Sequence, residues 1–206
     1  MLLDVNPTRM ELTRLRTRLA LARRGHKLLK DKRDELMRQW LGIIEEVREL
    51  RFSIEKEFQS IVERFILARA SAGSRQTEQE LLMSSKNVSV SVSKRNIMSV
   101  YVPEYTMEIS GDIIPYGYIN TSGEMDIALK SFEKFLENLL KLAEKEKMLQ
   151  LLAMEIEETR RRVNALEYKL IPDIIETIKF ITMKLDENER SNMVRLMRVK
   201  EIVKNR

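Results

Sequence analysis

Residues 12–50 decide the fold, and they read LTRLRTRLALARRGHKLLKDKRDELMRQWLGIIEEVREL. Apolar residues recur along this stretch at alternating steps of three and four, which is the heptad pattern of a coiled coil. When the pattern is continued to residue 68, thirteen of its seventeen core positions are apolar. It predicts one long helix within residues 1–70, with a core that includes Leu12, Leu15, Leu19, Leu29, Leu36, Ile43, Val47 and Leu50.

A second heptad pattern lies within residues 124–206, where eleven of sixteen core positions are apolar. Pro172 interrupts it, and an interior proline predicts a kink with the helix resuming at Asp173. Neither helix can bury its apolar stripe alone, so the sequence predicts a mostly α fold: a long antiparallel two-helix coiled coil. The core of the second helix is expected to contain Leu149, Ala153, Ile156, Arg160, Val163, Leu170, Ile174 and Ile181.

Residues 71–123 form the predicted connector, in which the apolar period changes from 3.5 to 2. Val88, Val90 and Val92 alternate with serines, which predicts a β-hairpin at about residues 88–102. We expect its turn at residues 94–96 and the end of its second strand at Pro103. A short helix is expected near residues 78–83. The second long helix exceeds the first, and if the two basic ends are level, we expect the surplus beside the hairpin, in a small cap.

Composition excludes several classes of protein. The 206 residues include no cysteine, so disulfides and thiolate metal sites are excluded. No run of about 18 uncharged apolar residues occurs, which predicts no insertion into a membrane. The first residues lack the basic and apolar segments of a signal peptide. These features favour a cytoplasmic protein.

Motifs for catalysis are absent from the sequence. No phosphate-binding loop of the G-x-x-x-x-G-K-[ST] type is present. His26 is the one histidine, and it occupies a heptad core position, where a polar residue fixes register or binds a local partner. We therefore predict no catalytic residue, no cofactor and no metal site.

Positive charge concentrates at both ends of the chain. Residues 1–34 carry ten basic and four acidic residues, a net of +6, and residues 184–206 carry a net of +3. In an antiparallel pair these segments meet at one tip, which favours insertion into an acidic or polar protein collar. Solvation of the charges is the plainest alternative, and an arm that binds nucleic acid or a homodimeric scaffold are others. The predicted docking residues of the tip are Arg9, Arg14, Arg18, Arg195 and Arg198.

Both helices carry stretches that resemble the D subunit of the V-type (archaeal and bacterial A-type) ATPases. At the start, NPTRMELTRL (6–15) and RGHKLLKDK (24–32) are similar to the beginning of that family. In the second helix the matching stretches are ETRRRVNALEY (158–168), with Pro172 behind it, and LDENER (185–190), and NIMSV (96–100) matches in the connector. The family's second signature corresponds here to Arg160, Arg161, Arg162, Asn164, Glu167 and Pro172.

The resemblance implies the central rotor shaft of a rotary ATPase. In that family the tip enters the ring of alternating A and B subunits, which make or hydrolyse ATP. The F subunit binds partway along the shaft, and the lower end sits on the C subunit (also called d), which is coupled to the membrane ring. The resemblance therefore implies a protein without catalytic residues, peripheral to the membrane, with these subunits as partners and no nucleic acid.

Overall fold

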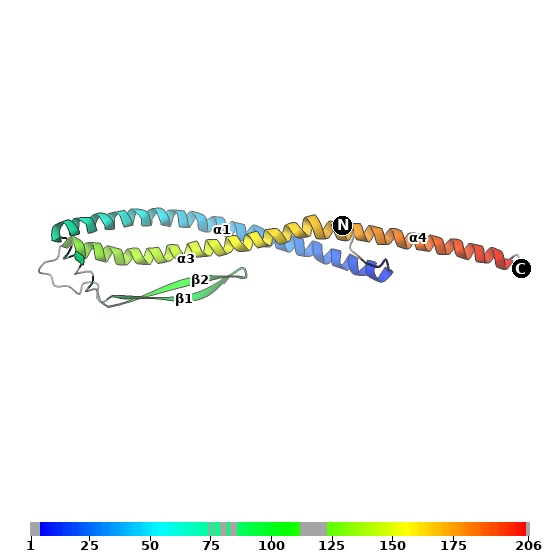
Figure 1. The fold of residues 1–206 in the computed structure, drawn as a ribbon, viewed down its shortest axis with the longest axis horizontal. Coiled ribbons are helices and arrows are strands. Elements are labelled where there is room, and N and C mark those ends of the chain that lie inside the picture. Colours follow the sequence, from blue (N-terminus) through cyan, green and yellow to red (C-terminus); the bar gives the residue numbers. More distant parts are fainter. Residues whose placement is uncertain are drawn as a thin grey trace. The chain divides into compact units, whose positions relative to one another are not determined.

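The computed structural model describes residues 5–73, 75, 77, 78, 82, 86–111 and 123–204. Helix α1 spans Arg9–Ala72, and strands β1 (Asn87–Ile97) and β2 (Val100–Ser110) follow it. Helix α3 spans Gly123–Ala165 and passes through the π-helical turn η1 (Leu166–Leu170) into α4 (Ile171–Lys204). Two long helical segments with a hairpin between them confirm the predicted mostly α fold (Figure 1). The expected short helix and the expected cap lie largely outside the described residues.

Local signals fix both ends of α1. The hydroxyl of Thr8 accepts a hydrogen bond from the backbone N–H of Glu11 at 3.3 Å, and the Thr8 carbonyl accepts one from Leu12. This is the arrangement of an N-capping threonine. At the other end Gly73 has φ +85° and donates its N–H to the Arg69 carbonyl. A glycine in this left-handed conformation stops the helix.

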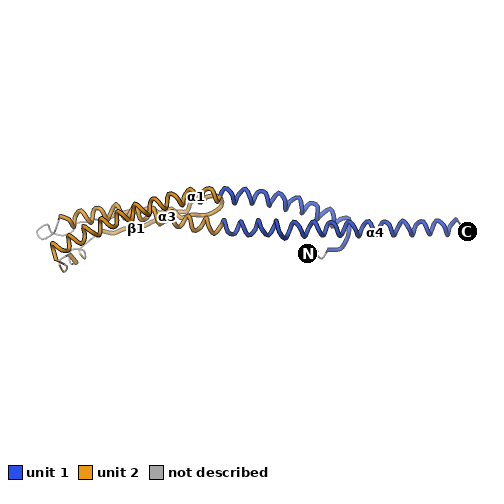
Figure 2. Tube along the Cα trace, turned by 90° about the horizontal axis from the view of Figure 1, so that it is seen from above, with its two compact units in different colours: residues 1–35, 156–206 blue, residues 36–155 orange. Residues whose placement is uncertain are grey.

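The chain divides into two compact units (Figure 2). Unit 2 comprises residues 36–155, and in it α1 and α3 run antiparallel, since early residues of α1 contact late residues of α3. Arg51 pairs with Glu146 at 2.5 Å, Glu57 accepts a hydrogen bond from Asn138 at 3.1 Å, and Ala68 and Met125 are buried together. The principal core contains Val47, Ile54, Ile61, Phe135 and Leu142.

Unit 1 comprises residues 1–35 and 156–206. Its core joins Leu15 of α1 to Ile174 and Ile181 of α4, with Leu12, Leu19 and Leu170 packed around them. Each such side chain contributes about 1.5–3 kcal/mol on full burial. Thr177 is also fully buried, and its hydroxyl donates to the Asp173 carbonyl at 2.7 Å, so this polar core position is satisfied within its own helix.

Between Leu149 and Val163 the buried stripe of α3 differs from the predicted one at two positions. Leu152 and Thr159 are buried, whereas the predicted Ala153 and Arg160 are exposed. From Leu149 to Ile156 the heptad pattern can step by three and then four, which reaches Leu152, or by four and then three, which reaches Ala153. Both residues are apolar, so the sequence does not choose between them. The structure takes the order that buries the larger Leu152 and leaves the Arg160 guanidinium in solvent, in agreement with the high energy of burying an unpaired charge.

The hairpin is longer than predicted, and its turn lies elsewhere. The turn residues are Met98 and Ser99, both with positive φ, and the side chain of Asn96 accepts a hydrogen bond from the Ser99 N–H at 2.9 Å. Placing the turn at residues 94–96 was therefore wrong. Ending the second strand at Pro103 was also wrong, because β2 continues to Ser110. Both strands of a two-stranded sheet are edge strands, where proline is tolerated.

The chain passes Pro172 without the expected restart at Asp173. The turn η1 directly precedes it, and the Ile171 N–H bonds the Leu166 carbonyl, five residues back. A proline ring clashes with the carbonyl four residues before it in a regular α-helix. The wider π turn is the local change that accommodates Pro172, and α4 continues from Ile171 as helix.

The surplus length of the second long helix lies in unit 1, and not beside the hairpin as predicted for level basic ends. Arg9, the first residue of α1, pairs with Glu189, so α4 continues for residues 190–204 beyond the start of α1. Within unit 2, Ala68 near the end of α1 is buried with Met125 near the start of α3, so the helices are level there. The chain adds its extra turns to the C-terminal tip and not beside the hairpin.

Candidate functional site

The segment of α4 beyond Glu189, residues 190–204, is termed the α4 extension. None of its side chains is buried, although it is rich in large apolar residues. Leu196 is 69 % exposed and Val203 is 70 % exposed. The other exposed apolar side chains of the extension are Met193, Val194, Met197, Val199 and Ile202.

Positive charge accompanies these apolar side chains. The extension carries Arg190, Arg195, Arg198, Lys200 and Lys204, and Glu201 is its one acidic residue. Exposed apolar residues that gather on one segment mark an interaction site. The combination suits an apolar socket with an acidic or polar rim, where the cations set orientation and the apolar residues supply affinity.

The predicted tip arginines all belong to unit 1 and are all exposed. Arg9 forms an ion pair with Glu189, and Arg14 lies 3.6 Å from Glu11 on its own helix. Arg18 lies on α1 as well, whereas Arg195 and Arg198 lie on the α4 extension. The structure therefore brings Arg9 to the base of the extension and distributes the others over two helices.

The leucine, isoleucine and valine residues given above for the predicted coiled-coil core are all buried or half-buried, whereas Ala153 and Arg160 are exposed. The buried ones are Leu15, Leu36, Val47, Ile156, Val163, Ile174 and Ile181. The half-buried ones are Leu12, Leu19, Leu29, Ile43, Leu50, Leu149 and Leu170.

The signature residues Arg160, Arg161, Arg162 and Asn164 lie on the solvent side of α3. Arg161 and Arg162 pair with Glu157 and Glu158, one turn earlier on the same helix. Glu167 lies in η1 and faces His26, and Pro172 follows that turn. Sequence reasoning missed the π turn, and its one visible signal was a proline in an otherwise regular helical pattern.

His26 has a local partner, which is one of the two roles predicted for its core position. Its Nε2 atom lies 3.5 Å from a carboxylate oxygen of Glu167, and this nitrogen is buried without a hydrogen bond. Among the described residues no group of three or more histidine, cysteine or acidic side chains could hold a metal ion. His26 therefore stands as one half of a polar contact between two helices.

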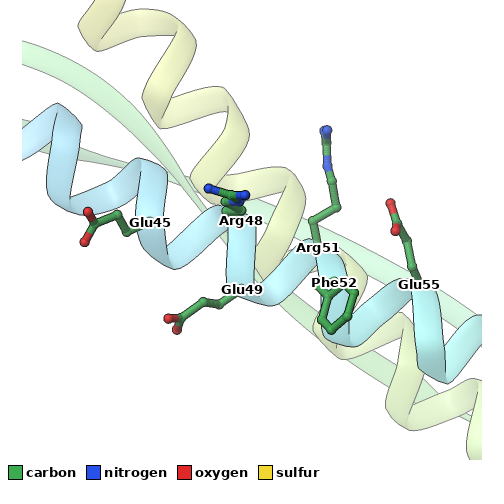
Figure 3. A pocket seen from close by; sticks show the side chains of 6 residues that line it. All are labelled: Glu45, Arg48, Glu49, Arg51, Phe52 and Glu55. Atoms are coloured by element: carbon green, nitrogen blue, oxygen red, sulfur yellow. The ribbon is translucent and has the colours of Figure 1, made fainter.

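Two hollows of unit 2 bring together no constellation of catalytic groups among the described residues. One is lined by six residues of α1 alone, whose side chains spread along the helix and do not converge (Figure 3). Another, of about 250 Å³, is apolar and lies between Phe58, Ile61, Val62 and Phe65 of α1 and Ala128, Leu129 and Phe132 of α3. Phe58 stacks on Phe135 beside it, with ring centres 5.5 Å apart. Here the apolar stripe of α1 widens toward Phe58 and Phe65.

No helix within the described ranges is both long enough and apolar enough to cross a bilayer. The apolar side chains of the α4 extension are interrupted by cations throughout, which is why they do not make a spanning segment.

Residues 11–201 match the family of ATP synthase D subunits. The chain is 53 % identical over 204 residues to the D subunit of the V-type ATP synthase from Thermoanaerobacter sp. (strain X514), covering 98 % of each chain. It is likewise 53 % identical to the V-type ATP synthase D subunit of Acetivibrio thermocellus, covering 98 % of this chain and 93 % of that one. Identity is 52 % to the corresponding V-type ATP synthase protein of Clostridium botulinum (strain ATCC 19397 / Type A), with 98 % and 96 % covered.

Proposed function

The chain belongs to the family of ATP synthase D subunits, and we propose that it is the central-stalk rotor subunit of a V-type rotary ATPase. It couples ATP hydrolysis or synthesis in the A/B ring to ion movement in the membrane ring. The observation that carries the proposal is the α4 extension, a helical end with exposed apolar and cationic side chains in a protein of this family. An end of this kind fits a socket in another protein.

The end of unit 1 formed by the start of α1 and the α4 extension inserts into the ring of A and B subunits. Its arginines steer entry, since complementary charge acts over longer distances than apolar contact. The apolar side chains of the extension then become buried in the socket. The F subunit binds the helical pair partway along, and the end that carries the hairpin connects through the C subunit (d) to the membrane ring.

Rotation transmits force between nucleotide sites only if the rotor contacts the ring subunits differently in their different states. In unit 1, α4 extends beyond the start of α1, and the two helices expose different side chains. The surface of unit 1 is therefore asymmetric, which contacts that differ between ring subunits require. The rotor works without catalytic residues of its own, on the cytoplasmic side and peripheral to the membrane. ATP chemistry belongs to the ring.

The test is co-purification with the A and B subunits, followed by a count of copies of this chain per complex. The rotor proposal expects one copy, and expects ATP to drive rotation of a bead attached to the hairpin end of unit 2. The free chain should run as a monomer in size-exclusion chromatography with mass measurement. A stable homodimer that does not bind the A and B subunits would favour the homodimeric scaffold. Steeply salt-dependent binding to nucleic acid would favour the nucleic-acid-binding arm.

A further inference from the structure

The two outer edges of the hairpin have different surroundings. The outer edge of β2 faces α3, where the carboxylate of Glu144 accepts a hydrogen bond from the Tyr105 N–H at 3.2 Å. An ion pair of 2.5 Å between Lys86 and Glu133 holds the approach to β1 against the same helix. Figure 1 shows β2 between β1 and α3. Strand β1 is exposed from Asn87 to Asn96, so its outer edge is the open one.

The Tyr105 contact fixes the direction of the backbone groups of β1. Tyr105 lies opposite Val92, and its N–H points away from β1, so this is a non-hydrogen-bonded pair of the ladder. The N–H and C=O of Val92 must then also point outward. Alternation along the strand extends this to Val88, Val90 and Lys94. Their backbone groups make no hydrogen bond to another described element.

The side chains leave this row of backbone groups accessible. The hydroxyls of Ser89, Ser91 and Ser93 reach across to carbonyls of β2, at 3.3–3.4 Å, and so turn away from the outer edge. Proteins usually block a long free edge with charged side chains, especially lysine, with proline or with a bulge. In β1 the cations Lys94 and Arg95 lie near the turn, and residues 87–93 carry no charge. Within the hairpin, proline occurs only in β2, where Pro103 shares the outward orientation of Tyr105. An unblocked edge of this length can pair with another strand.

We propose that the outer edge of β1 binds an extended strand from another subunit of the rotary ATPase, through main-chain hydrogen bonds. This rests on the proposed function, which supplies the assembly. The added strand places apolar residues beside Val88, Val90 and Val92, and an acidic residue level with Lys94 and Arg95. Those two cations are exposed and have no ion pair with a described residue, and β1 carries no acidic side chain.

A second copy of this chain is a poorer occupant of the edge. Pairing β1 with another β1 adds a second Lys94 and a second Arg95 to a strand pair without acidic residues. In parallel register these like charges face each other across the paired strands, which is destabilising. In an antiparallel pair centred on residues 90–92 they lie opposite uncharged residues and gain no carboxylate partner. A strand with carboxylates meets the same row of backbone groups without that repulsion.

Hydrogen exchange of individual amides in the assembled complex tests the proposal against the isolated chain. Strand addition should slow exchange at Val88, Val90, Val92 and Lys94 by about tenfold or more, since each N–H gains a hydrogen bond. The amides of Ser89, Ser91 and Ser93 already bond to β2 and should change little. Unchanged rates at the outward amides would overturn the proposal, and so would slowing without alternation, which indicates side-chain packing on the sheet.

A matched pair of variants sharpens the test. Val90→Pro removes one outward N–H and leaves the hydrogen bonds between β1 and β2 in place. Pro103 occupies an equivalent outward position on β2. Val90→Thr is the matched control, because it keeps both the N–H and the shape of the side chain. In the complex, Val90→Pro should lose the slow exchange at Val88 and Val92, and Val90→Thr should keep it. Protected Ser89 and Ser91 amides would show that the hairpin still folds. Equal protection in both variants would contradict strand addition.

The outcomes separate this proposal from the rotor proposal. If the chain does not co-purify with A and B subunits, the proposed function fails before any exchange is measured. If it co-purifies and the outward amides exchange as in the isolated chain, only strand addition fails. Protection of the outward amides of Val88, Val90 and Val92 in the isolated chain, together with a doubled mass, would assign the edge to a second copy and overturn the choice of partner.

Discussion

His26 of α1 and Glu167 of η1 face each other within unit 1, with Nε2 of the imidazole 3.5 Å from a carboxylate oxygen. The two residues lie 141 positions apart in the sequence, and their contact joins α1 to the π turn that precedes Pro172. The imidazole nitrogen is buried without a hydrogen bond, whereas the Glu167 side chain is half exposed. A core position is thus occupied by a polar group whose partner keeps much of its contact with water.

Replacing His26 with leucine should stabilise the protein. A buried polar atom without a hydrogen bond costs about 1–3 kcal/mol, and leucine at this heptad position removes that cost while filling the site. We expect His26→Leu to raise the free energy of unfolding by about 1 kcal/mol, measured by denaturant titration. Glu167→Gln is the control, with a change within about 0.5 kcal/mol because a 3.5 Å contact with a half-exposed side chain contributes little. A less stable His26→Leu variant would show that the polar contact itself stabilises the fold.

The sequence alone predicted that residue 26 would fix register or find a local partner, but it did not identify the partner. Heptad spacing places a residue on the core side of its helix, whereas its neighbour depends on the register between two helices. Here the register also includes the π turn, which adds a residue to one turn of helix. The ambiguity at Leu152 and Ala153 has the same origin, since either residue satisfies the apolar pattern and packing chooses between them.

Core and extension residues should respond differently to truncation of a side chain. Ile174 is fully buried against Leu15 and Ile181, so Ile174→Ala should lower the free energy of unfolding by about 2–5 kcal/mol. Leu196 is exposed, and Leu196→Ala should change it by less than about 0.5 kcal/mol. Both are measured by thermal unfolding of the isolated chain. A loss at Leu196 comparable to that at Ile174 would mean that the extension packs against the chain in solution.

Pro172→Ala should remove the reason for the π turn. Alanine supplies an N–H to the carbonyl one turn back and relieves the clash with the ring. We expect the free energy of unfolding to rise by about 1 kcal/mol. This is less than the ~3 kcal/mol that an interior proline costs a regular helix, because η1 already accommodates the ring. Slower hydrogen exchange at Leu170 and Ile171 should accompany this gain. In a rotating complex the variant should also twist less under load, and an unchanged torsional stiffness would contradict this expectation.

The hairpin could be predicted in kind but not in extent. Alternating valine and serine indicated β1, whereas Pro103 suggested an end to β2 that the structure does not have. Proline blocks a strand only where its missing N–H would face the partner. Which edge faces the partner depends on how the ribbon lies on α3, through Glu144 and Tyr105, and a pattern read along the chain carries no information on that contact.

Reversing the charge of Arg14, Arg18, Arg195 and Arg198 together should weaken binding to the ring of A and B subunits. All four are exposed on unit 1, and attraction between complementary surfaces is screened as salt rises. We expect at least about a tenfold loss of affinity at low ionic strength, a loss of about 1.4 kcal/mol in binding free energy, and a smaller loss at high salt. The control reverses four exposed cations of unit 2, Arg64, Lys130, Lys134 and Lys141, which changes the net charge equally. Equal losses in both variants would assign the effect to net charge, and undiminished binding of the first variant at low salt would remove the arginines from the docking surface.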